Sequence, residues 1–102
     1  MILRIGSRLR SAVCEAEVVV VRSSGGEVDL RCGGRPMLGI DEPAPEGAAP
    51  DSGFAAGVLL GKRYVDADGS FELLCTKPGA GSLAVADEPL GIKDAKPLPS
   101  SD

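Results

Sequence analysis

The sequence predicts a small, mainly β domain with little helix, and three observations lead to this fold class. Residues 17–21 contain four consecutive valines, and β-branched residues favour strands over helices. Residues 27–31 alternate polar and apolar side chains, as a strand with one buried face does. Runs of small residues separate such segments, as turns do. The chain of 102 residues is one domain at most, and we expect about five to seven short strands in it.

The first half of the chain is expected to form a β-hairpin. Residues 23–26 read Ser-Ser-Gly-Gly and join the strands at 17–21 and 27–31, so they predict a turn between two antiparallel strands. Shortly after these strands, Gly33 and Gly34 permit a sharp reversal of the backbone that most residues could not adopt.

An acidic segment separates the two halves. Residues 41–57 contain three prolines, three glycines and four carboxylates, with no lysine or arginine. This composition is typical of a long loop or linker and predicts a crossover rather than a packed element.

The second half is expected to repeat the pattern of strands and turns. Its elements, in order, are extended segments at 58–60 and 63–65, a turn at 66–69, a strand at 71–76, a turn at 77–81 and a strand at 82–86. We therefore expect a single β domain at 1–90 and an extended tail at 91–102.

The two halves also align with each other. Glu17 lies over Glu72 and Leu30 over Val85 without a gap, and a two-residue deletion then places Pro36-Met37 over Pro89-Leu90. The alignment predicts two β-hairpin repeats, at about 13–37 and 58–90. They would pack face to face or edge to edge about a pseudo-twofold axis, with the acidic segment as the crossover.

The composition excludes several kinds of chemistry and opposes others. The sequence has no His, Asn, Gln or Trp, so Ser-His-Asp and Cys-His catalysis are excluded within one chain, as are imidazole metal ligands. The 15 acidic residues outnumber the 11 basic ones, which opposes binding to a phosphate backbone. We expect neither nucleic acid nor a membrane as a partner.

The beginning of the sequence lacks the apolar stretch of roughly 7 to 15 residues that a secretory signal requires. The longest apolar run without glycine, residues 18–21, is far too short to span a membrane. A cytoplasmic location is expected, and the three cysteines are then expected to be reduced thiols.

Two cysteines flank the first predicted hairpin. Cys14 lies just before it, and Cys32 opens the sequence Cys-Gly-Gly-Arg-Pro-Met just after it. Over residues 13–37 this order resembles the metal-binding hairpin of desulforedoxin-type and rubredoxin-like proteins, in which two cysteine knuckles enclose two strands. This chain departs from the family pattern where Glu17 and Arg31 occupy the places of two of the four cysteines.

The resemblance implies a zinc or iron site built mainly from thiolates, because structural zinc and rubredoxin-type iron take four tetrahedral ligands. The candidate ligands are Cys14, Cys32, Glu17 and Cys75. A second subunit is the alternative source of the fourth ligand. The opposite interpretation also stays open, in which the hairpin binds no metal and Cys75 is a small buried apolar residue.

Cys32 is in addition a candidate reactive thiol. Arg31 and Arg35 lie near it in the sequence, and neighbouring glycine amides could stabilise its thiolate. An enzyme with Cys32 as nucleophile is therefore a third hypothesis. The structural alternative is that Cys32 packs beneath the turn.

The main functional expectation is a non-catalytic accessory or protein-binding module without a cofactor. Exposed strand edges in so small a sheet need covering by a larger enzyme or by a second copy in a homodimer. The expected contacts are a hydrophobic strand edge and the turn Gly33, Gly34, Arg35, Pro36 and Met37. The alternative function is that of a zinc- or iron-thiolate protein that uses Cys14 and Cys32 for structure or electron transfer.

Overall fold

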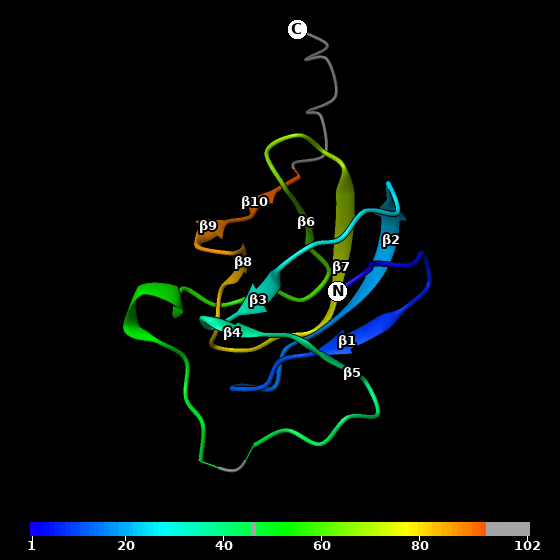
Figure 1. The fold of residues 1–102 in the computed structure, drawn as a ribbon. Helices are drawn as coiled ribbons and strands as arrows, with labels where there is room; N and C mark the ends of the chain where they lie inside the picture. Colours follow the sequence, from blue (N-terminus) through cyan, green and yellow to red (C-terminus); the bar gives the residue numbers. More distant parts are fainter. Residues whose placement is uncertain (46, 94–102) are drawn as a thin grey trace, which may run out of the picture.

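Short antiparallel strands make up most of the ordered secondary structure (Figure 1), which confirms the mainly β fold class. The computed structural model describes residues 1–45 and 47–93. Within these ranges the elements are β1 Arg8–Arg10, β2 Glu17–Ser23, β3 Leu30–Cys32, β4 Arg35–Pro36, β5 Leu38–Gly39, the 3-10 turn η1 Ser52–Phe54, β6 Arg63–Val65, β7 Phe71–Lys77, β8 Leu83–Val85, β9 Glu88–Pro89 and β10 Gly91–Ile92. The described part of the chain has more strands than expected because four of them are two residues long.

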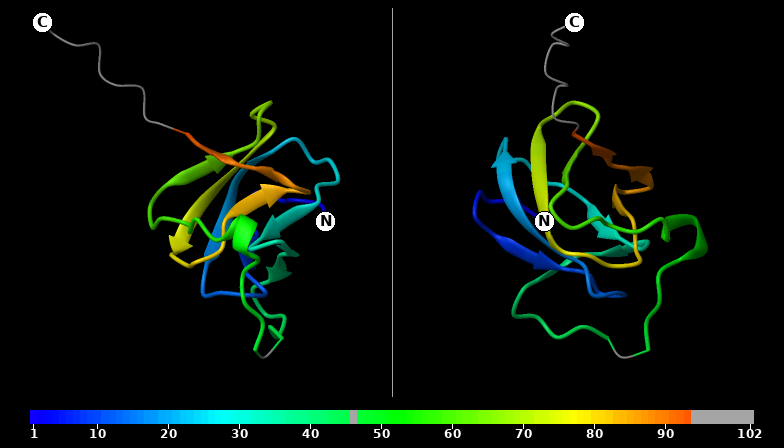
Figure 2. Two further views of the ribbon diagram at one scale, coloured as in Figure 1. Left: turned by 90° about the vertical axis from the view of Figure 1, so that its left-hand side faces the viewer. Right: turned by 180° about the vertical axis from the view of Figure 1, so that it is seen from behind.

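The strands form two antiparallel sheets (Figure 2). The order is β10-β6-β7-β2-β1-β5 in the larger sheet and β4-β3-β8-β9 in the smaller one. The expected pairing of residues 17–21 with 27–31 is not found, because β2 pairs with β1 and β7 whereas β3 pairs with β4 and β8. The central pairs of both sheets thus join strands from different halves of the chain.

The strand order of each sheet is symmetric between the two halves of the chain. When each strand of β1–β5 is exchanged with its counterpart in β6–β10 (β1 with β6, β2 with β7, and so on), the same order is obtained from the opposite edge. Glu17 pairs with Arg10 in β1 as Glu72 pairs with Val65 in β6, which agrees with the alignment of Glu17 over Glu72. The amide of Met37 donates to Leu30, and that of Leu90 donates to Leu83, so Leu30 matches Leu83 rather than Val85. The two-residue deletion therefore falls before β8. Descent of the halves from a duplicated unit stays a prediction.

One core lies between the sheets. Met37 alone joins β4 to β5, and Leu90 alone joins β9 to β10, so the chain passes between the sheets at both sides. Val18, Val20 and Leu73 on the paired strands β2 and β7 are almost fully buried. The remaining buried members of the cluster are Leu3, Leu9, Ala16, Leu30, Cys32, Met37, Val58, Tyr64, Phe71, Cys75 and Leu83.

Residues outside the strands differ in part from the expectations. The acidic segment 41–57 links β5 to β6 as a crossover, apart from residue 46, which lies outside the described residues. The expected tail does not begin at 91, because β10 pairs there with β6. Of that tail, residues 94–102 lie outside the described residues. No helix in the described ranges is long and apolar enough to cross a membrane.

The turn between β8 and β9 contains a strained residue. Ala86 has a φ of 53°, in the left-handed region, at the place that Gly33 occupies between β3 and β4. Because Ala86 is exposed, its methyl group contributes little burial. We expect Ala86→Gly to raise the free energy of unfolding by about 0.5 kcal/mol, since relief of strain exceeds the entropy cost of glycine. Urea unfolding measures this change, and a lower midpoint for the variant would contradict it.

Candidate functional site

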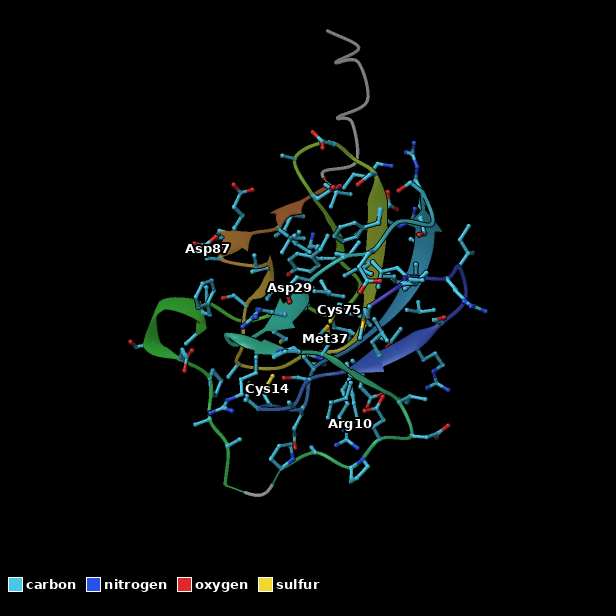
Figure 3. All side chains as sticks on the ribbon, in the orientation of Figure 1. Arg10, Cys14, Asp29, Met37, Cys75 and Asp87 are labelled. Atoms are coloured by element: carbon cyan, nitrogen blue, oxygen red, sulfur yellow. The ribbon has the colours of Figure 1, made fainter. Side chains whose placement is uncertain are left out.

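Two thiols meet beside the core. Cys14 lies between β1 and β2, and Cys32 ends β3; their Sγ atoms are 3.9 Å apart. Cys75, on β7, is close enough for the charge of Cys14 to affect it. Figure 3 labels Cys14 and Cys75, and all three cysteines are free thiols. The structure therefore brings together the two cysteines that the sequence placed in one site.

A buried hydroxyl positions Cys14. The amide of Ser11 donates to the carbonyl of Ala16 at 2.9 Å, which closes the short segment between β1 and β2. Within this turn the Oγ of Ser11 accepts hydrogen bonds from the amides of Val13 and Cys14, at 3.1 and 3.2 Å. Ser11 is fully buried, and this local bonding satisfies its hydroxyl, as a buried polar group requires. The Ser11 turn holds Cys14 over the end of β3.

A glycine loop covers the two thiols. The amide of Gly81 donates to Sγ of Cys14 at 3.4 Å. A Cβ atom at Gly79 would lie 2.7 Å from the same sulfur, and one at Gly81 would lie 3.2 Å from Sγ of Cys32. Sequence reasoning placed residues 77–81 in a turn and did not connect them with the cysteines. The available signal was the pair Gly79 and Gly81, because only residues without a side chain let the backbone approach the two sulfurs so closely.

The two thiols differ in acidity. Burial raises the pKa of Cys14, but hydrogen bonds involving Ser11, Ala16, Gly81 and Cys32 outweigh this effect and lower it below the ordinary value. Burial raises the pKa of Cys32 to about 12. Cys14 is half-buried, whereas Cys32 is fully buried. The burial of Cys32 agrees with the structural alternative of a thiol packed beneath the turn, and Cys14 is the thiol with the more stable thiolate.

The other candidate metal ligands face different partners. The carboxylate of Glu17 lies 4.0 Å from Nζ of Lys77, and the thiol of Cys75 donates to the carbonyl of Lys77 at 3.2 Å. Within residues 1–45 and 47–93, no three Cys, Asp or Glu side chains are arranged to hold a metal ion. The zinc or iron site stays a prediction, and of its four candidate ligands the structure brings the sulfurs of Cys14 and Cys32 to 3.9 Å from each other.

Only part of the predicted contact turn, residues 33–37, is exposed. Arg35 and Pro36, in β4, are exposed, but Met37 is 2% exposed and packs in the core. Met37 cannot offer its side chain to a partner, because the crossing from β4 to β5 turns it inward. Gly33 and Gly34 lie against the chain around Pro50 and Asp51. Gly33 and Gly34 therefore pack the acidic crossover against this turn, and the role of Arg35 and Pro36 in partner binding stays a prediction.

An apolar groove lies on the side of β10. Its volume is about 280 Å³. Its apolar lining includes Leu59, Tyr64, Leu83, Pro89, Leu90 and Ile92. Leu59 and Ile92 are 54% and 42% exposed, and the adjacent Leu60 is 63% exposed. Sequence reasoning placed residues 58–60 in an extended segment and did not identify the groove.

A second hollow, of about 360 Å³, is acidic. Asp29, Asp51 and Asp87 line it together with Arg31, and Figure 3 labels Asp29 and Asp87. Arg31 donates to Asp29 at 3.1 Å and to the carbonyl of Gly34 at 3.3 Å. The arginine is thus held within the wall by internal bonds.

No protein-family model, curated protein or solved structure matches the chain. The functional argument consequently depends on the geometry of the thiol pair and of the apolar groove.

Proposed function

We propose that this domain is a non-catalytic binding module that docks an extended, apolar segment of a partner protein in the groove beside β10. The observation that carries the proposal is the pair of exposed apolar side chains Leu59 and Ile92, which line a groove of about 280 Å³. Large apolar side chains gathered at a concave surface are typical of interaction sites.

The sheet edge favours an extended occupant. β10 is an end strand of the larger sheet, so its outer edge is unpaired within the described residues. An added strand would bond to this edge through its backbone and place alternate side chains in the neighbouring groove. A second copy of the chain is the alternative occupant, and a dimer in solution that buries the groove would reveal it.

Selection of peptides from a randomised display library against the folded chain tests this proposal. We expect peptides with alternating apolar residues, and we expect them to shift the amide NMR signals of residues 59–60 and 90–92. Leu59→Asp should weaken binding by about tenfold or more, because burial of a leucine side chain contributes roughly 1.5–3 kcal/mol.

The matched control is Ile5→Asp. Ile5 is an apolar residue that is 69% exposed, as Leu59 is 54% exposed, but it belongs to the other half of the chain. This variant should bind the selected peptides as the unmodified chain does. Equal weakening by both variants, shifts confined to other surfaces, or a dimer that buries the groove would each overturn the proposal.

A further inference from the structure

The thiol pair carries an inference that does not depend on the groove. Cys14 and Cys32 are 18 positions apart in the sequence, yet their sulfurs are separated by only 3.9 Å. A disulfide bond needs about 2.05 Å between sulfurs, so a displacement of about 2 Å would join them. Rotation of the side chains about χ1, with a small movement of the Ser11 turn, covers such a distance.

The surroundings of the two sulfurs assign them different parts in a reaction. Cys14 is half-buried and so is the more accessible residue of the pair, and the Gly81 amide donates to its sulfur. Hydrogen bonds to sulfur favour the thiolate, which is the nucleophilic form. Cys32 is fully buried behind it and has no access to solvent. An oxidant from solution therefore meets Cys14 first.

We propose that Cys14 and Cys32 form a modification site for small hydroperoxides, in which Cys14 is oxidised first and Cys32 converts the product to an intramolecular disulfide. The oxidant is hydrogen peroxide or an organic hydroperoxide of similar size. Cys75 takes no part, because its thiol is buried and donates to the carbonyl of Lys77.

The reaction balances in two steps. The Cys14 thiolate attacks the terminal oxygen of the peroxide, the O–O bond breaks, and the products are Cys14 sulfenic acid and hydroxide or alkoxide. Cys32 sulfur then attacks the Cys14 sulfur, its proton leaves with the sulfenic oxygen, and one water molecule is released as the S–S bond forms. Overall, two thiols lose two protons and two electrons, and the peroxide gains them.

Mass spectrometry of the full chain tests the proposal. After treatment of the reduced protein with hydrogen peroxide, we expect a product two hydrogens lighter, with one pair of linked peptides that contains Cys14 and Cys32. In Cys32→Ser the sulfenic acid should persist and be trapped by dimedone on Cys14. Cys14→Ser should form no disulfide, and Cys75→Ser should be oxidised as readily as the unmodified chain.

Two further measurements keep the test decisive if a cysteine variant fails to fold. In the unmodified native chain, limited iodoacetamide should modify Cys14 at least about tenfold faster than Cys32 or Cys75, because only Cys14 combines access with a stabilised thiolate. Dimedone present during peroxide treatment should mark Cys14 before the disulfide forms. A disulfide that includes Cys75, dimedone on Cys32, or oxidation to sulfinic acid without a disulfide would overturn the proposal.

Discussion

Gly79→Ala is expected to lower the free energy of unfolding by about 3 kcal/mol, because the added methyl group would overlap atoms of Ala16 and Cys14. The added Cβ would lie 2.5 Å from the amide nitrogen of Ala16 and 2.7 Å from Sγ of Cys14. Ala16 is fully buried, and the backbone of Gly79 is held by paired hydrogen bonds with Val58, at 2.9 and 3.4 Å. Gly79 cannot move without breaking these bonds, and Ala16 cannot move without breaking its bond from the Ser11 amide.

Urea unfolding with Gly26→Ala as the matched control checks this prediction. Gly26 also lies in a loop after a long strand, has no left-handed φ, and has open space where a Cβ would be. Gly26→Ala should change the free energy of unfolding by less than about 0.5 kcal/mol. If Gly79→Ala behaved like this control, the glycine loop would not press against Cys14 as described.

Local sequence patterns predicted five of the ten strands in the described residues, β2, β3, β6, β7 and β8, but not their partners. The four valines after Glu17 and the run after Phe71 each form a long strand, β2 and β7, close to the expected bounds. Alternation reports which face of a strand is buried, and it contains no information on which strand lies beside it. The pairing of Val19 with Leu74 joins residues from different halves of the chain, so hairpin reasoning could not find it.

The same limit applies to the candidate site. The sequence grouped Cys14 with Cys32 because both flank the first predicted hairpin, and their sulfurs do meet. Their relative acidity depends on the hydrogen bond from Gly81 to Cys14 and on the deep burial of Cys32. Gly81 lies between β7 and β8, and the burial results from the packing of the two sheets. Two neighbouring arginines suggested a stabilised Cys32 thiolate, but Arg31 donates to Asp29 instead.

Removal of both cations beside Glu72 is the second large effect that we expect. Glu72 is a carboxylate on β7 that is only 3% exposed, and it accepts hydrogen bonds from Lys93 at 2.9 Å and from Arg63 at 3.0 Å. The double variant Arg63→Met, Lys93→Met leaves this buried charge without a partner. We expect it to lower the free energy of unfolding by about 3 kcal/mol at pH 7.

The effect should depend on pH with a definite sign. In the unmodified chain the hydrogen bond from Lys93 lowers the pKa of Glu72, burial opposes this, and the bond from Arg63 adds to the lowering. The ionised carboxylate therefore stabilises the fold above about pH 4.3, the ordinary value for glutamate, and this contribution is lost as the pH falls below it. In the double variant burial acts alone, so the pKa rises and ionisation destabilises the fold as the pH increases.

The difference in stability between the two proteins should consequently be large at pH 7 and shrink toward pH 4, where urea unfolding can measure it. Glu72→Gln in the double-variant background is the control, because it removes the charge and keeps the shape of the side chain. It should recover part of the stability lost at pH 7 and make the remaining difference nearly independent of pH. If the difference between the unmodified chain and the double variant, with Glu72 intact, stayed constant from pH 7 to pH 4, Glu72 would be hydrated. The ion pairs would then contribute no more than ordinary surface pairs.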